Sequence, residues 1–427
     1  MPPEGGASFL SQVRPYAGLF GLLGIATFFE GFDTRLISLV QPLIAEEFGA
    51  NKQELGLALG LSSLGMMAAF FVIHLADWLG RRPLFLGALG AYAILTLATA
   101  LAPNLVTFTG LQIFARMAMV VNIGLAYLML SEEMPAEIRG RMNGLLGAFA
   151  ALGAAVPDAL LAPLESIEIS WRGLFWIGAL PLLLLPFYFA RLPETRAFEL
   201  RRARAPETLH FDFGEERALL GRLVAPAYRF RLGGITTIWL AINFWSGTAL
   251  YFFTLYAFNE RGWGPSDLAL LPYGTIPIGF LGYSLSGFLM DRLGRRSAAT
   301  LYLIAAFAAT AACYQTSEYG LIYAAYCGLI GLGGIWSIAT TWTAELFPTE
   351  LRATAYGVSN NLLGRIGLVV GPIAAGSLSA ALGSTADAIT LLAVSTLLVL
   401  PIVWALPETN AIDLAVSNTT NPTEDLS

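Results

Sequence analysis

Three ionisable residues lie close together in one long apolar segment near the start of the chain. Glu30, Asp33 and Arg35 fall inside the apolar run 17–44. About 20 apolar residues are enough to cross a lipid bilayer. An ionisable side chain at membrane depth costs roughly 2.5–3.5 kcal/mol on insertion scales and faces a protein interior or a water-filled cavity. The segment therefore predicts the wall of a polar path through a membrane.

Two further arginines are predicted near the middle of the membrane. Glu30 and Asp33 are spaced i, i+3, which places both carboxylates on one face of a helix, whereas Arg35 lies about 200° round from Asp33. Arg116 and Arg365 each lie about 11 residues into an apolar segment. This corresponds to a depth of roughly 16–17 Å in a hydrocarbon core about 30 Å thick.

Carboxylates and arginines at this depth have the chemistry that coupled transport requires. A low-dielectric environment favours the protonated carboxyl group, whereas a nearby arginine favours the ionised one. A substrate that competes for the arginine therefore changes the proton affinity of the carboxylate, and the effect is reciprocal. We predict proton coupling at Asp33 and Glu30 and substrate binding at Arg365 and Arg116. The alternative is a set of buried ion pairs that only join helices.

Four more residues are candidate substrate ligands. Gln112 and Asn361 each precede one of the two central arginines by four residues, so they lie one turn earlier on the same helix face. Trp245 and Trp342 are candidates to stack on a flat substrate, with a core or membrane-interface position as the alternative.

The composition indicates an integral membrane protein. Of the 427 residues, 56% are hydrophobic and 13% are charged, and the mean hydropathy is +0.65; soluble domains carry about 25% charged residues. His74 and His210 are far apart, and Cys313 and Cys327 are the only cysteines. We therefore expect no metal site, no cofactor, no enzymatic activity and no nucleic-acid partner. The expected partners are membrane lipid, protons and a small-molecule substrate, bound by a monomer.

The apolar segments predict an all-α protein with twelve transmembrane helices. The predicted spans are 18–44, 55–76, 83–102, 105–130, 142–163, 172–190, 233–258, 267–290, 298–315, 319–344, 354–381 and 387–406. With the N-terminus inside, the cytoplasmic segments hold 18 of the 24 basic residues and the outer loops hold 3. This bias predicts that both termini are cytoplasmic.

The two halves of the sequence repeat three short motifs in the same order. The segments 77–82, 135–139 and 192–195 recur at 291–296, 348–352 and 406–409, at offsets of 213 or 214. Parallel repeats of six spans predict two similar bundles with a binding site between them at the midplane. We expect an N-terminal six-helix bundle (1–190), a cytoplasmic linker (191–231), a C-terminal six-helix bundle (232–409) and a disordered cytoplasmic tail (410–427).

The repeated loop Asp-x-x-Gly-Arg-Arg resembles that of the major facilitator superfamily, and the resemblance covers nearly the whole chain. A tight glycine turn holds a carboxylate and arginines at a cytoplasmic helix junction, where they can pair with the opposite half and separate as the halves move. The resemblance implies alternating access with a gate near these loops. The predicted gating residues are Asp77, Arg81, Arg82, Asp291, Arg295, Arg296, Glu133, Arg139, Glu345 and Arg352.

Within this superfamily the motifs are similar to those of two groups. Glu30-Gly-Phe-Asp33 and Gly364-Arg-Ile-Gly367 resemble aromatic-acid–proton and related metabolite symporters. Sugar porters share Phe32-Asp-Thr34 and the Pro-Glu-Thr motifs. The prediction is a proton-coupled symporter of a small organic acid, with aromatic acids among the candidates, in the bacterial inner membrane. The alternatives are a sugar or polyol symporter, a drug or metabolite exporter and a transporter-like receptor.

Overall fold

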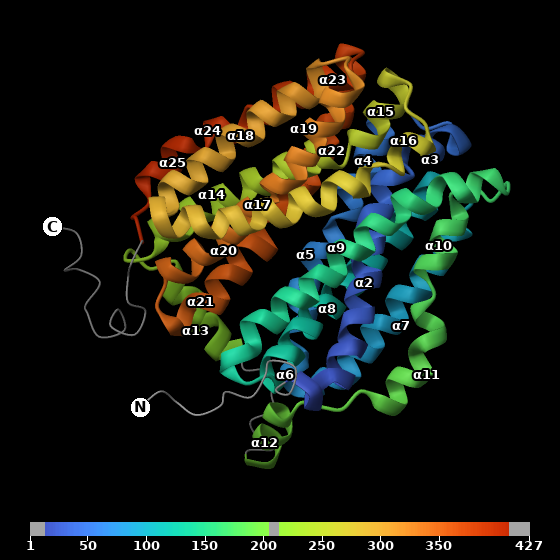
Figure 1. Ribbon diagram of the computed structural model, residues 1–427. Coiled ribbons are helices and arrows are strands. Elements are labelled where there is room, and N and C mark those ends of the chain that lie inside the picture. The colour runs from blue at the N-terminus through green and yellow to red at the C-terminus, as the bar shows by residue number, and fades with distance from the viewer. Residues whose placement is uncertain (1–12, 205–212, 410–427) are drawn as a thin grey trace, which may run out of the picture.

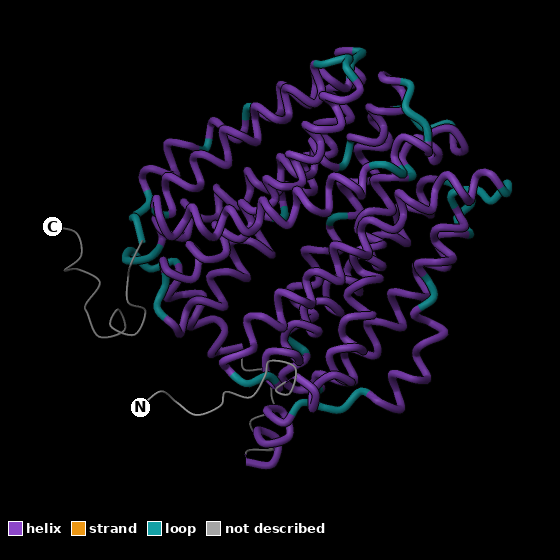
Figure 2. The backbone as a smooth tube through the Cα atoms, in the orientation of Figure 1, coloured by secondary structure: helices purple, strands orange, loops and turns teal. Residues whose placement is uncertain are grey.

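The computed structural model describes residues 13–204 and 213–409. Figures 1 and 2 show helices joined by short loops throughout this part of the chain. Within these described ranges, twelve helical segments are long and apolar enough to cross a membrane, which confirms the predicted all-α class and the number of spans. These segments are Arg14–Leu39, Lys52–Ile73, Arg81–Ala100, Leu105–Glu133, Arg141–Ser166, Arg172–Arg191, Arg229–Arg261, Pro265–Leu293, Arg295–Gln315, Tyr319–Leu346, Glu350–Leu382 and Thr385–Ala405.

Several spans of the first half are interrupted helices. The second span, for example, divides at Ser63. The sixth divides before Pro181, because proline disrupts a helix interior. The elements are η1 (Arg14–Tyr16), α2 (Ala17–Leu39), α3 (Gln41–Phe48), α4 (Lys52–Ser62), α5 (Leu64–Ile73), α6 (Ala76–Leu79), α7 (Arg81–Ala100), α8 (Leu105–Glu133), α9 (Ala136–Ser166), α10 (Arg172–Gly178) and α11 (Pro181–Arg191).

The second half repeats this pattern after two short helices of the linker, α12 (Arg196–Arg204) and α13 (Phe213–Leu223). Two of its spans contain π-helical turns. The elements are α14 (Arg229–Trp245), η3 (Ser246–Leu250), α15 (Phe253–Arg261), α16 (Pro265–Leu268), α17 (Leu271–Leu293), α18 (Arg295–Gln315), α19 (Tyr319–Gly331), η4 (Leu332–Gly334), α20 (Ile335–Leu346), α21 (Thr349–Tyr356), η5 (Gly357–Gly364), α22 (Ile366–Leu382), α23 (Thr385–Ala393), α24 (Ser395–Leu398) and α25 (Leu400–Ala405).

The helices form two groups that meet at one end and diverge at the other (Figure 1). We call the diverging end, where α12 and α13 lie, the linker side, and the opposite end the far side. Buried apolar residues of the first half's far side, such as Phe32 and Trp171, belong to one cluster with the core of the second half. Apolar residues of the first half's linker side, such as Phe85 and Met129, form a separate cluster. The two halves are therefore packed together on the far side.

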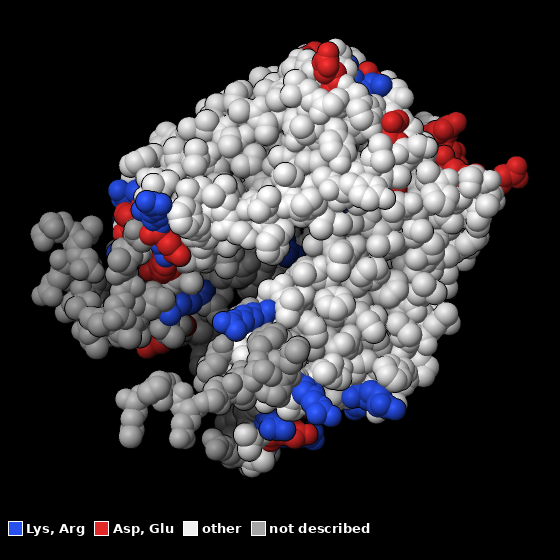
Figure 3. Space-filling view, in the orientation of Figure 1, with Lys and Arg blue, Asp and Glu red and all other residues white. Residues whose placement is uncertain are grey.

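The lateral surface suits a lipid environment. Large apolar side chains such as Leu183, Phe280 and Tyr273 are more than two-thirds exposed. On the face shown in Figure 3 a wide belt has no charges, the far side is mostly acidic, and the linker side carries basic residues with some acidic ones among them. Soluble monomers rarely expose so much contiguous apolar surface.

The first and fifth spans cross at glycines. A Cβ atom on Gly31 would overlap the backbone of Ala150, and one on Gly153 would overlap the carbonyl oxygen of Phe28. Small residues let two transmembrane helices approach closely. The crossing therefore holds α2, which carries the central acids, firmly against α9.

Candidate functional site

Two arginines from opposite halves meet at Met66, in the second span. Arg365 Nη1 donates a 2.8 Å hydrogen bond to the Met66 carbonyl oxygen. Arg116 Nη1 lies 3.9 Å from the Met66 sulfur, 3.3 Å from Ser63 Oγ and 3.5 Å from the Tyr251 hydroxyl. The Arg116 guanidinium also lies over the Tyr251 ring, 5.5 Å from its centroid. These contacts place both predicted substrate-binding arginines at the interface of the halves.

The two predicted coupling acids lie beside these arginines. Asp33 is fully buried, and neither of its carboxylate oxygens has a hydrogen-bond partner among the described residues. Its strongest charge interaction is with Arg116. Glu30 accepts a 3.2 Å hydrogen bond from Thr34 and interacts with the charge of Arg365, across the interface. An unpartnered buried acceptor beside an arginine with spare donors indicates a site that a ligand or a proton completes.

Two π-helical turns set the position of the second half's contributions. Arg365 directly follows η5, and Tyr251 directly follows η3. π-turns inside α-helices are frequent at functional sites. In η5 it is Asn360, rather than the predicted Asn361, that joins a hydrogen-bond network, because its side chain contacts Asn243 at 3.3 Å and the Tyr356 hydroxyl at 2.9 Å.

The other predicted ligands take part in helix packing. Gln112 is buried and donates a 3.0 Å hydrogen bond to Thr99. The Trp245 indole donates to Thr310 at 3.0 Å, and the Trp342 indole donates to a backbone carbonyl at 3.2 Å. Both rings are almost fully buried. In this conformation neither tryptophan is open to a substrate.

The space between the halves opens on the linker side. Figure 3 shows a hollow there, with basic side chains at its rim and inside it. On the far side, Lys52 of the first half donates 2.9 Å hydrogen bonds to Glu260 and Thr385 of the second half. Glu260 also accepts from the backbone nitrogens of Thr385 and Ala386, at 2.6 Å and 3.2 Å. The central site is therefore closed on the far side in this conformation.

Arg35 forms an ion pair that its sequence spacing does not reveal. Its guanidinium binds Asp158 of α9 through Nε, at 2.9 and 3.1 Å, and through Nη2, at 2.7 Å. The remaining nitrogen donates to Ser38 at 2.8 Å. Arg35 is thus separate from the Asp33 site, as its angular offset predicts.

The first repeated loop is a compact network inside the first half. Gly80 has a φ of 101°, which favours glycine, and Glu194 accepts hydrogen bonds from the following backbone nitrogens of Arg81 and Arg82. The Arg81 side chain binds Glu132 at 3.0 Å. Glu132 also accepts a 2.5 Å hydrogen bond from the Thr195 hydroxyl. In the Pro-Glu-Thr motif, Glu194 therefore caps the N-terminus of α7, and Thr195 holds Glu132, the partner of Arg81.

The second loop repeats this network. Gly294 has a φ of 87°, and Glu408 accepts from the backbone nitrogen of Arg295 at 2.8 Å. Arg295 binds Glu345 at 2.6 Å, and Glu345 accepts from the Thr409 hydroxyl at 2.6 Å. In both halves the second loop arginine, Arg82 or Arg296, donates to a backbone carbonyl.

These networks differ from the predicted gate in their partners. Glu345 binds Arg295 rather than Arg352, whose Nε donates to a backbone carbonyl. Glu133 contacts Arg196 of the linker at 3.7 Å, and the position equivalent to Glu345 is Glu132. Asp291 is mostly exposed and lies 3.5 Å from Arg295. The side chains of Asp77 and Arg139 lie outside the part of the chain that the structure describes, as does the predicted tail 410–427.

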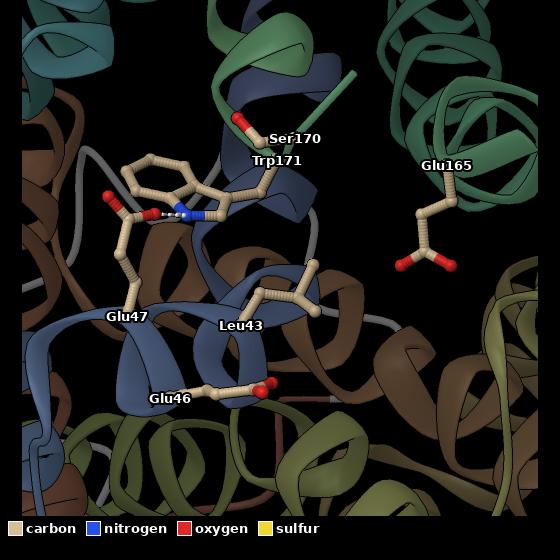
Figure 4. A pocket seen from close by; sticks show the side chains of 6 residues that line it. All are labelled: Leu43, Glu46, Glu47, Glu165, Ser170 and Trp171. Atoms are coloured by element: carbon tan, nitrogen blue, oxygen red, sulfur yellow. Dashed lines mark hydrogen bonds between the residues drawn. The ribbon is translucent and has the colours of Figure 1, made fainter. Parts of the chain in front are cut away.

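A pocket of about 310 Å³ lies on the far side, away from the central arginines (Figure 4). Glu46, Glu47 and Glu165 line it, together with Trp171, whose indole donates a 2.6 Å hydrogen bond to Glu47. Within the described ranges, no group of three His, Cys, Asp or Glu residues has the arrangement of a metal site.

Comparison with known proteins adds family information to this geometry. The sequence model described as Major Facilitator Superfamily matches residues 23–372. The 3-(3-hydroxy-phenyl)propionate transporter of Escherichia coli is 28% identical, over 84% of this chain and 86% of that protein. The niacin transporter NiaP of Acinetobacter baylyi is 24% identical, over 83% and 85%. A bacterial homologue of the human lysosomal transporter Spinster has a similar structure, with a TM-score of 0.74, 15% identity and coverage of 94% and 97%.

Proposed function

Because this chain belongs to the major facilitator superfamily and is a multi-pass membrane transporter rather than an enzyme, we propose that it carries a small organic acid. The observation that carries this proposal is Arg365 at the interface of the halves. A guanidinium has five N–H donors, and Arg365 makes one hydrogen bond to the described protein, with Met66. The remaining donors are available to a carboxylate, which arginine binds in a bidentate geometry.

The proposed substrate class is supported by the relatives. Those named as 3-(3-hydroxy-phenyl)propionate, niacin and gallate transporters carry small aromatic molecules with a carboxyl group. Arg116 lies beside the Met66 sulfur and over the Tyr251 ring, whereas Arg365 binds the Met66 carbonyl oxygen. We propose that the aromatic part of the substrate packs near the Tyr251 ring.

We further propose that transport is proton-coupled symport. Asp33 and Glu30 are the proton carriers, because each lies near one of the two arginines that the substrate would engage. An anion that binds an arginine weakens that arginine's hold on the neighbouring carboxylate, and the carboxylate then takes up a proton. Substrate and proton binding therefore favour one another.

The proposed setting is a bacterial inner membrane, with the linker side and both termini in the cytoplasm. Most of the basic residues visible in Figure 3 lie on the linker side, with some acidic residues among them, whereas the far side is mostly acidic. Basic loops favour the cytoplasmic face. In this orientation the conformation is inward-open, and the repeated loops face the cytoplasm.

The test is ligand binding to purified protein in detergent, with Arg365 intact or replaced. We expect Arg365→Lys to weaken the binding of aromatic acids at least tenfold, since lysine cannot make the bidentate contact. Arg365→Ala should remove nearly all binding. Losing a hydrogen bond to a charged group costs about 1.5–3 kcal/mol, and about 1.4 kcal/mol is a factor of ten in affinity.

The control is Arg261→Lys, because Arg261 lies on the far side and contacts Tyr256 and a backbone carbonyl. It should leave affinity unchanged. A screen of sugars and polyols in the same assay examines the alternative substrate class. Equal affinity of all variants for organic acids would exclude the carboxylate contact and leave Arg365 as a packing residue.

A further inference from the structure

The Arg35–Asp158 pair is a buried ion pair inside one half of the transporter. Its side chains are 10% and 8% exposed. Three nitrogen–oxygen contacts of 2.7–3.1 Å join them, and the remaining guanidinium nitrogen donates a hydrogen bond to Ser38. Both residues belong to the first half, so the pair itself can stay intact when the two halves move apart.

The second half covers this pair on the far side. Tyr326 of α19 is close enough to interact electrostatically with both Arg35 and Asp158. Its ring is buried and stacks on that of Phe253, with the centroids 3.7 Å apart. α9 packs against α16 and α17, and α2 packs against α15. Far-side opening would withdraw these elements and let water reach the ion pair.

Burial of two charges is costly even when they are paired, because in many buried pairs the mutual attraction does not repay the lost hydration. This pair loses its hydration when the far side closes and regains it when the far side opens. The cost of desolvation therefore falls mainly on the closed state. We propose that Arg35–Asp158 opposes far-side closure and so returns the emptied transporter toward the outward-open state. This inference rests on the proposed alternating-access transport.

The direction of this effect is opposite to that of Lys52–Glu260. The Lys52 contact joins the two halves and exists only while the far side is closed, so it stabilises closure. The Arg35 contact joins two helices of the same half and loses hydration on closure. The two pairs together would keep both conformations accessible.

Lys52 also supplies the measurement, since it is the only lysine in the chain. Its amine is bound in the closed state and becomes free when the far side opens. Full-length protein in detergent, without substrate, is treated with a water-soluble amine-acetylating reagent, and the modification of Lys52 is followed by peptide mass spectrometry. Glu260→Gln, Thr385→Ala, which removes both side-chain partners of the amine, calibrates the fast limit.

In the double variant Arg35→Met, Asp158→Leu, we expect the reagent to modify Lys52 roughly tenfold more slowly than in the native protein, because an apolar pair favours closure. The polar double variant Arg35→Gln, Asp158→Asn should slow the reaction less. Arg222→Met with Glu350→Leu removes an exposed ion pair on the linker side and should leave the rate unchanged.

An unchanged or faster rate in either folded Arg35–Asp158 double variant would overturn the proposal and assign the pair to helix packing alone. If the apolar variant does not fold, the polar variant decides. The reaction contains no substrate, so a failure of the Arg365 carboxylate contact would not alter it. Conversely, the Arg35–Asp158 double variants could bind organic acids as the native protein does and also show an unchanged Lys52 rate. That result would leave the proposed function standing and remove only this inference.

Discussion

At the scale of single residues, the central site holds two arginines and two acids with few protein partners. Arg365 and Arg116 approach Met66 from opposite halves, and Asp33 is buried without a hydrogen-bond partner among the described residues. An unsatisfied buried carboxylate costs free energy that a purely structural role would not require. This supports a role for Asp33 in proton exchange.

Asp33→Asn is expected to abolish uphill accumulation of substrate driven by a proton gradient, because an amide cannot take up and release a proton. Exchange of labelled for unlabelled substrate without a gradient should persist. The measurement is uptake into proteoliposomes with an imposed pH difference. Glu318→Gln, at an exposed acid on the far side, is the matched control; full accumulation by a well-folded Asp33→Asn protein would remove Asp33 from the coupling role.

At the scale of helices, close crossings and π-turns position the site. α2 approaches α9 at Gly31 and Gly153, which leave no room for a side chain. η3 and η5 interrupt two spans within their length, and Tyr251 and Arg365, which directly follow these turns, contact the first half. The repeated glycine turns and their glutamate caps brace each half internally.

Gly153→Ala is expected to destabilise the protein by about 1–3 kcal/mol, the usual cost of overpacking. The added methyl group overlaps the Phe28 carbonyl and forces α2 away from α9. Gly144→Ala lies in the same helix with nothing within 4 Å, and should keep or raise stability. Thermal unfolding in detergent compares the two, and equal midpoints would mean that the crossing is looser than described.

At the scale of the molecule, the transporter is closed on the far side and open on the linker side. The far-side cluster of apolar residues spans both halves, and Lys52 crosses between them to Glu260 and Thr385. The loop networks on the linker side stay within their own halves. This distribution of contacts lets the halves separate on one side while each remains intact.

Lys52→Gln is expected to shift the population toward the far-side-open state, because the variant loses a contact between the halves. Spin labels at positions 106 and 382, both exposed on the far side, would report a larger share of long distances. Both native cysteines are replaced in the labelled protein. Arg222→Gln, on the linker side, is the control, and identical distance distributions for Lys52→Gln and the native protein would contradict the prediction.

The fold class and the number of spans follow from the sequence alone, and the sequence also predicts the depth of the central charges. Apolar length and charge cost are local properties, so the spans and the positions of Asp33, Arg116 and Arg365 can be predicted without contacts. The repeat could also have identified Glu132, since the offset of 213 from Glu345 leads to it rather than to Glu133.

The pairing of the charges and the choice of residues that face the site become known only from the folded arrangement of the helices. Arg35 with Asp158 and Lys52 with Glu260 join residues more than 100 positions apart, and nothing in their spacing indicates contact. The π-turns change the helical register near Asn360 and Tyr251, so an ideal 3.6-residue period misplaces their faces. Partner choice between charges depends on the packing of whole helices, because many combinations satisfy the same sequence pattern.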